Sequence, residues 1–130
     1  MISNVINVIR NKAHYSALSG ATDEEIEKAQ TILNTSFAED YKDYIREFGI
    51  VSYQGHELTG ICGFERLNVV DVTLAKRRNN PKVPQNYYVI EQTNMDGAII
   101  WQDSTGVIYR AFHDEEPERL CGSLMEYVDT

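Results

Sequence analysis

Residues 87–112, YYVIEQTNMDGAIIWQDSTGVIYRAF, form the segment around which we expect the fold to be organised. The segment contains three short runs that are rich in aromatic and β-branched residues, at positions 87–91, 98–102 and 107–112. Such residues favour strands, and turn residues separate the runs: Asn94, Asp96 and Gly97 first, then residues 103–106, DSTG. Short strands bounded by turn residues predict an antiparallel meander. Because this segment also carries the only tryptophan, we expect the other elements to pack against it.

Apolar residues at helical spacing predict helices on both sides of the meander. The predicted helices span residues 2–13, 22–34, 38–48, 69–78 and 123–128. Thr22 and Glu25 form a T-x-x-E capping box at the start of the second helix, and Ser123 and Glu126 repeat the pattern in the last one. Gly49 stands where a C-terminal cap of the third helix belongs.

Residues 69–78, VVDVTLAKRR, fit two kinds of secondary structure. Their valines and threonine favour a strand. Asn68 is a good helix cap, however, and Val70, Leu74 and Arg78 would share one face of a helix. We therefore favour a helix, and the two prolines that follow it place residues 79–86 in a loop.

These elements predict an α+β fold, with a mostly antiparallel sheet, the meander at its centre, and helices packed against it. Two further short strands are expected at residues 51–53 and 56–61, and an acidic loop at residues 113–118. The 130 residues suit a single domain, residues 1–130, because no linker, repeat or low-complexity tract divides them.

The composition is that of an ordinary globular protein, with 42% apolar and 25% charged residues. No run approaches the ~20 apolar residues of a membrane span, and the N-terminal segment lacks the layout of a signal peptide. We therefore expect a cytoplasmic protein without membrane contact. The net charge of −8 argues against direct binding of nucleic acid, whose phosphates require a basic surface. An acidic surface suits either a basic protein partner or solubility alone.

Nucleophilic catalysis requires a nucleophile held by a base, and Cys62 lies six residues after His56 in the sequence. Cys62 and Cys121 belong to no C-x-x-C pair, and in a cytoplasmic protein two reduced thiols are the simpler interpretation. A small hydrolase that uses Cys62 and His56 stays open as an alternative. Residues 103–106 are interpreted as a hairpin turn, because they have one residue too many for an aspartic-protease D-T-G loop.

Two charged clusters have simple interpretations. His113 is followed directly by three acidic residues, and adjacent side chains in a loop point in different directions, so we expect no metal site there. The only basic cluster contains Lys76, Arg77, Arg78 and Lys82. It is too short to define a nucleic-acid-binding face on an acidic protein, and we interpret it as a solvated helix end.

The segment from residue 113 to residue 130 is the most acidic part of the chain. Its carboxylates could form a solvated surface without further function. The functional interpretation is a patch that binds a basic protein partner, since complementary charge favours association. In that case the expected partner-binding residues are Asp114, Glu115, Glu116 and Glu118.

Several motifs follow one another in a characteristic order along nearly the whole chain. They are ATDEEIE at 21–27, FAEDYKDYI at 37–45 with Phe48-Gly49, VDVTLAKR at 70–77, VIE at 89–91, WQD at 101–103, VIY at 107–109, and the terminal helix at 123–128. This ordered set resembles the SUKH superfamily, which is typified by the yeast cell-wall-assembly regulator family and has many bacterial members.

The resemblance implies an α+β fold with helices packed on a mostly antiparallel sheet, and it implies a helix at residues 69–78. It also implies an immunity protein, which would bind and neutralise the toxin domain of a polymorphic or contact-dependent toxin, often a basic nuclease, inside the producing cell. The alternative that it implies is a non-enzymatic scaffold or regulatory module that binds a host protein. The resemblance implies no catalytic residues, cofactor or metal for this chain, so we expect a protein without enzymatic activity.

Overall fold

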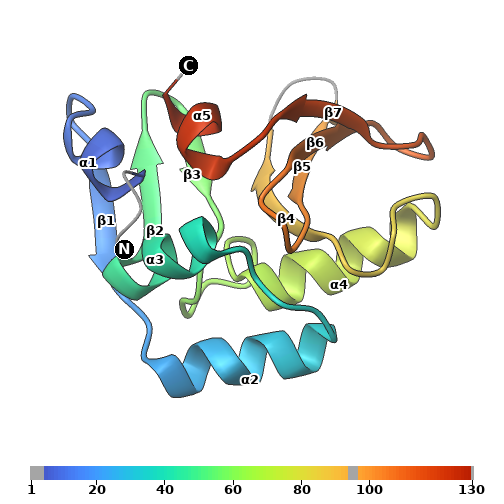
Figure 1. Ribbon diagram of the computed structural model, residues 1–130, viewed down its shortest axis with the longest axis horizontal. Coiled ribbons are helices and arrows are strands. Elements are labelled where there is room, and N and C mark those ends of the chain that lie inside the picture. The colour runs from blue at the N-terminus through green and yellow to red at the C-terminus, as the bar shows by residue number, and fades with distance from the viewer. Residues whose placement is uncertain (1–4, 94–96, 130) are drawn as a thin grey trace.

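The computed structural model describes residues 5–93 and 97–129 of the chain (Figure 1). Within them lie five helices and seven strands, and the seven strands form a single sheet. In chain order the elements are α1 (Val5–Arg10), β1 (Ser16–Ser19), α2 (Asp23–Leu33), α3 (Glu39–Glu47), β2 (Phe48–Tyr53), β3 (His56–Leu58), α4 (Val69–Asn79), β4 (Tyr88–Gln92), β5 (Ile99–Gln102), β6 (Ile108–Ala111), β7 (Glu118–Cys121) and α5 (Leu124–Val128). The predicted α+β class is confirmed.

The strands lie in the sheet in the order in which they occur in the chain, and each neighbouring pair is antiparallel. The predicted meander is β4, β5 and β6, with Trp101 paired to Val89 on one side and to Tyr109 on the other. Gly97 and Gly106 have φ values of +74° and +106°, which glycine adopts without steric cost. The rest of the first predicted turn, with Asn94 and Asp96, lies outside the described residues.

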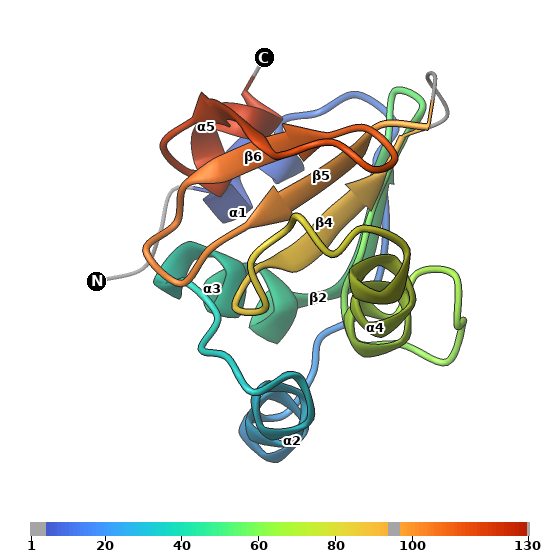
Figure 2. The ribbon, with the colours of Figure 1, turned by 90° about the vertical axis from the view of Figure 1, so that its right-hand side faces the viewer.

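The sheet is bent, and helices cover both of its faces. In Figure 1, β1–β3 stand to the left and β4–β7 to the right, with α5 between them at the top. Figure 2 shows α4 alongside the meander, and α2 lies below both of them in this view. The larger core lies against α1, α3 and α5 and includes Tyr41, Tyr44 and Tyr88. The smaller core lies around Trp101, where Val72 of α4 faces the meander. The prediction that other elements pack on this segment is therefore confirmed.

Two strands were not expected from the sequence, and both are edges of the sheet. All four residues of β1 are exposed, and β7 is exposed at three of its four positions. An edge strand that buries so little carries almost no hydrophobic alternation, which is the signal that strand prediction needs. The predicted helix over residues 2–13 ends earlier than expected, at Arg10, because the chain turns there to enter β1.

The third helix ends differently from the prediction. Gly49 does not cap α3, because Phe48 is already extended, with φ −127° and ψ 132°, and the chain continues directly into β2. The glycine is needed for a close approach between strands instead. A Cβ atom at Gly49 would lie 2.5 Å from the carbonyl oxygen of Ser19 in the neighbouring β1.

The predicted caps of the other helices are confirmed, with one correction. Asn68 accepts a hydrogen bond from the Val70 N–H at the start of α4. Ser123 Oγ accepts one from Glu126 N–H at the start of α5, but Glu126 contacts Gly122 N–H, so this second capping box does not close. Asp40 of α3 completes that cap, since its Oδ2 accepts from Leu124 N–H at 2.7 Å.

The capping box of α2 gives a direct stability prediction. Thr22 Oγ1 accepts from Glu25 N–H at 3.2 Å, and Glu25 Oε1 accepts from Thr22 N–H at 2.9 Å. Thr22→Ala removes the hydroxyl and is expected to lower the free energy of unfolding by about 1 kcal/mol. Thr22→Ser keeps the hydroxyl and serves as the control. Urea unfolding followed by far-UV circular dichroism measures both, and equal losses for the two variants would exclude a capping role.

Candidate partner-binding surface

The four predicted contact residues lie together at the end of the β6–β7 hairpin. Asp114, Glu115 and Glu116 are exposed in the turn, whereas Glu118 is the first residue of β7, which corrects the loop predicted for residues 113–118. Asp114 has a φ of +63°, in the left-handed region that aspartate adopts more readily than most residues. The N–H of Glu115 donates to the Phe112 carbonyl at 3.1 Å and closes the turn. We call residues 113–118 the acidic turn.

Asn80 fixes the acidic turn from outside the hairpin. Its side chain is buried, and Nδ2 donates to the carbonyl oxygens of Phe112 at 3.3 Å and of Glu115 at 2.9 Å. One carbonyl directly before the acidic turn and one within it are thus tied to the C-terminal cap of α4. Asn80 falls in the loop predicted for residues 79–86, and no role is predicted for it from sequence. Its partners are more than 30 positions away along the chain, and no local pattern could have revealed them.

The four carboxylates differ in how far their charge is neutralised. Glu118 pairs with Arg110, with Oε1 2.6 Å from Nη2. Asp114 has His113 as a neighbour, at 3.5 Å between Oδ2 and Nε2. Glu115 and Glu116 form no ion pair with any residue that the structure describes. These two glutamates are therefore the part of the acidic turn that is best able to attract a cation.

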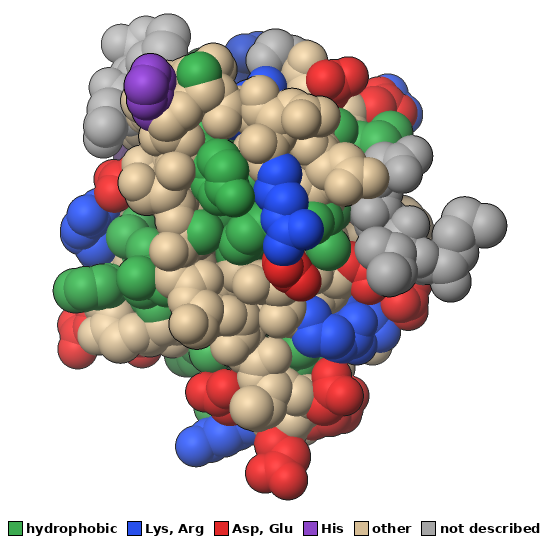
Figure 3. Space-filling view, turned by 90° about the vertical axis from the view of Figure 1, so that its left-hand side faces the viewer, with side chains coloured by type: hydrophobic (Ala, Val, Ile, Leu, Met, Phe, Trp, Pro, Cys, Tyr) green, Lys and Arg blue, Asp and Glu red, His purple; other side chains and the backbone are tan. Residues whose placement is uncertain are grey.

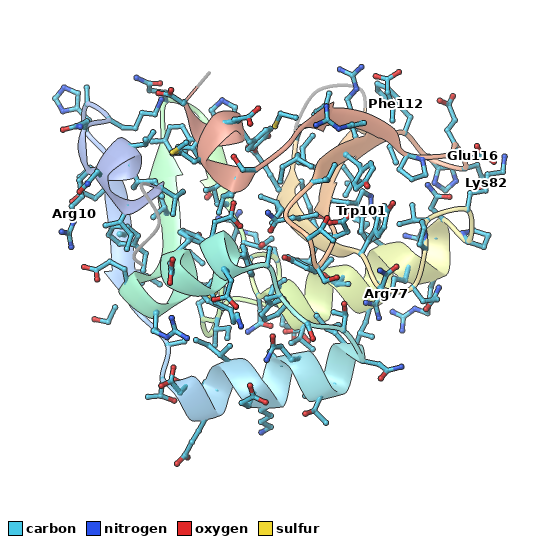
Figure 4. The ribbon with its side chains drawn as sticks, in the orientation of Figure 1. Arg10, Arg77, Lys82, Trp101, Phe112 and Glu116 are labelled. Atoms are coloured by element: carbon cyan, nitrogen blue, oxygen red, sulfur yellow. The ribbon has the colours of Figure 1, made fainter. Side chains whose placement is uncertain are left out.

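The basic cluster at the end of α4 is only partly the solvated group that was predicted. Arg78 and Lys82 are exposed, and Figure 4 places Lys82 at the same end of the molecule as Glu116. Arg77 is buried instead, which corrects the prediction. Its Nη1 donates to the Leu33 carbonyl at 2.9 Å and its Nη2 donates to the Tyr87 carbonyl at 3.1 Å.

The Arg77 guanidinium therefore joins α4 to the C-terminal end of α2 and to the start of the meander. A cation suits that position, because the carbonyl end of a helix carries partial negative charge. Burial lowers the pKa of Arg77 from its ordinary value, although the guanidinium remains charged.

The structure does not bring Cys62 and His56 together. The Cys62 Sγ lies 3.6 Å from the Phe64 carbonyl, in the loop before α4. The His56 Nδ1 lies 3.0 Å from Glu91 Oε2, and its ring stacks on Tyr53. Among the described residues, no contact joins the thiol to the imidazole. The nucleophile and base that the hydrolase alternative requires are thus not assembled in this structure.

Glu91 forms a polar cluster that no local sequence pattern indicates. Glu91 is 3% exposed, and its carboxylate accepts hydrogen bonds from the Tyr127 hydroxyl and from His56. The cluster links β3, β4 and α5 and so holds the last helix against the sheet. Burial, together with the adjacent carboxylate of Glu91, raises the pKa of Tyr127 well above its ordinary range.

Residues 103–106 form the predicted hairpin turn. Asp103 Oδ1 accepts hydrogen bonds from the backbone N–H groups of Thr105, Gly106 and Val107 at 2.9–3.2 Å. Oδ2 accepts from the Tyr109 hydroxyl at 2.8 Å. The aspartate is thus used to shape the turn, which confirms the hairpin interpretation.

Among the residues that the structure describes, no three His, Cys, Asp or Glu side chains gather in a way that could hold a metal ion. None of the helices in residues 5–93 and 97–129 is long and apolar enough to cross a bilayer.

Together these features define a small α+β protein whose candidate site is a rigidly held, exposed acidic turn. A family model described as SMI1-KNR4 cell-wall, SUKH_5, matches residues 2–130. The chain therefore belongs to this family of the SUKH superfamily, as the order of its motifs indicated. No curated protein matches the sequence significantly.

Proposed function

We propose that this protein is a cytoplasmic immunity protein, which binds a cognate toxin domain and neutralises it by covering its active site. Membership of the family supports the proposal, because immunity is the function that the SUKH resemblance implies for bacterial members. The observation that carries it is the acidic turn, where Glu115 and Glu116 are exposed and without ion pairs among the described residues, on a backbone that Asn80 fixes.

A fixed cluster of carboxylates suits a basic partner such as a nuclease. Charge complementarity accelerates the encounter of two proteins and orients them, and its effect weakens as salt increases. Because the turn is held before binding, little conformational entropy is lost when the partner docks. The function requires binding and no chemistry from this chain.

The decisive experiment is a toxicity-rescue assay. The toxin domain encoded beside this gene is expressed in a sensitive cell, with and without this protein. We expect rescue, together with co-purification of the two proteins at low salt. Absence of both rescue and a complex would contradict the proposal for that pairing. Capture of a host protein instead would favour a scaffold or regulatory module.

Reversing charge in the acidic turn tests whether this surface makes the contact. Glu115→Lys combined with Glu116→Lys is expected to lower the association rate constant for the toxin domain about tenfold or more at low salt, and to flatten its salt dependence. Stopped-flow or surface plasmon resonance at several salt concentrations measures both effects. Reversing all four acidic residues of the turn should enlarge the change.

The matched control reverses two exposed carboxylates elsewhere. Glu27→Lys combined with Asp129→Lys changes the net charge by the same amount, on α2 and after α5. We expect this control to reduce the association rate much less. If both double variants slow association equally, net charge matters and the acidic turn is not the contact surface.

A further inference from the structure

A groove runs between α2 and the N-terminal end of α4. Its volume is about 470 Å³, within the range of roughly 300–1,000 Å³ in which ligand-binding pockets fall. The loop of residues 61–63 forms the third wall. Apolar side chains from all three segments line the groove: Ala29, Ile32, Ile61 and Val70.

Three large apolar side chains on or next to the segments that form this groove are exposed. Ile32, which lines it, is 48% exposed. Phe64, directly after the loop of residues 61–63, is 57% exposed, and Leu74 is 36% exposed one turn beyond Val70 on α4. Neither of these two residues lines the groove itself. Ile32, Phe64 and Leu74 are three of the five large hydrophobic residues that are exposed in the described part of the chain. Apolar groups that cluster on a surface and border a groove mark interaction sites.

Hydrogen bonds hold the walls of the groove in place. The Asn68 side-chain Nδ2 donates to the Cys62 carbonyl at 2.9 Å. Gly60 N–H donates to the Leu67 carbonyl at 2.9 Å, and Val69 N–H donates to the Gly60 carbonyl at 2.8 Å. Both ends of the loop are thereby tied to the start of α4. The groove is formed before any partner arrives, which reduces the entropic cost of binding.

The charge around the groove is predominantly negative. Glu25 and Asp71 line the groove and make no ion pair with a described residue, against Lys28 in the same lining. Glu24 and Glu27, also on α2, form no ion pair with a described residue either. Figure 3 shows acidic side chains gathered at the lower end of the molecule, over α2. An occupant that pairs with these carboxylates must be basic, and an aliphatic side chain on it would match the aliphatic lining of Ala29, Ile32, Ile61 and Val70.

We propose that this groove docks a segment of a partner protein in which an aliphatic side chain lies next to lysine or arginine. The aliphatic group would contact Ile32 and Val70, and the cation would face Glu25 and Asp71. The groove is separate from the acidic turn, which lies at the far end of the β6–β7 hairpin in Figure 1. The inference thus does not depend on the identity of the toxin or on the contact made by the turn.

A pair of synthetic peptides tests this chemistry on the full-length protein. One fluorescein-labelled peptide carries two leucines flanked by lysines, and its match carries glutamates in place of the lysines. Fluorescence anisotropy at low salt measures both affinities. We expect the lysine peptide to bind at least about tenfold more tightly than the glutamate peptide. Equal affinities, or no binding of either peptide, would overturn the proposal.

The variants Ile32→Lys and Leu18→Lys distinguish binding of the lysine peptide in the groove from its general attraction to an acidic protein. Both variants add one positive charge at a similarly exposed apolar residue, since Leu18 on β1 is 43% exposed. We expect Ile32→Lys to weaken binding of the lysine peptide about tenfold or more and Leu18→Lys to change it little. Equal effects would show that the peptide responds to net charge, and the groove would then have no special role.

Cys62 supplies a local readout, because it lines the groove and is a free thiol. In a Cys121→Ser background, the rate at which Cys62 reacts with a thiol reagent is measured with and without the lysine peptide. Saturating peptide is expected to slow the reaction several-fold in the Leu18→Lys protein and to leave it unchanged in the Ile32→Lys protein. Peptide binding without protection of Cys62 would place the peptide elsewhere and overturn the inference.

Discussion

Gly60→Ala is expected to abolish the native fold, or to lower the free energy of unfolding by about 4 kcal/mol or more. A Cβ atom at this position would lie 1.7 Å from the Gly49 carbonyl oxygen and 2.8 Å from its carbonyl carbon. Both are backbone atoms of β2, so no side-chain rotation can relieve the overlap. Gly60 cannot move either, because its N–H and carbonyl bond to Leu67 and Val69.

Gly63→Ala is the matched control, because Gly63 lies in the same loop and a Cβ atom there would meet nothing within 4 Å. Its effect on stability should stay within about 1 kcal/mol, since the alanine only restricts the unfolded chain. Far-UV circular dichroism during urea unfolding measures both variants. Similar midpoints for Gly60→Ala and Gly63→Ala would show that β2 and the loop can separate, and the close approach would not be essential.

The elements that could be predicted from sequence are those whose signal is local. The capping box of Thr22 and Glu25 predicted the start of α2, and the turn residues between the three runs, with Gly97 and Gly106, predicted the meander. In each case the residues that decide the structure lie within a few positions of one another. The edge strands β1 and β7 lack such a signal, because their pairing partners determine them and all of their side chains except that of Cys121 are exposed.

The candidate site was predictable only as a charge pattern. The run Asp114, Glu115 and Glu116 is visible in the sequence, but its rigidity depends on Asn80, which contacts the turn from the end of α4. The role of Arg77 also depends on distant residues. Sequence predicts a solvated cation there, yet Arg77 is buried and its guanidinium donates hydrogen bonds to the carbonyls of Leu33 and Tyr87. Sequence reveals charges, whereas long-range contacts decide which of them are free to bind a partner.

Trp101→Ala is expected to lower the free energy of unfolding by about 3–5 kcal/mol, the usual cost of removing a buried aromatic side chain. Trp101 is 1% exposed and is at the centre of the smaller core, where Val72, Val83 and Val89 surround it. These neighbours come from α4, the loop after it and β4. They are fixed by hydrogen bonds such as Val89 N–H to Thr73 Oγ1 at 3.0 Å, so they cannot collapse into the space.

Trp101→Phe separates packing from hydrogen bonding at this position. The indole Nε1 is buried and has no hydrogen-bond partner among the described residues, so phenylalanine leaves no polar group unsatisfied. We therefore expect a smaller loss of unfolding free energy than for alanine, caused only by the lost ring volume.

Phe64→Ala is the control at an exposed aromatic residue. Phe64 is 57% exposed, and its replacement should lower the free energy of unfolding by about 0.5 kcal/mol or less. Because the chain has one tryptophan, unfolding must be followed by circular dichroism. Equal losses for Trp101→Phe and Trp101→Ala would mean that the indole nitrogen has a partner and that packing is not the main contribution.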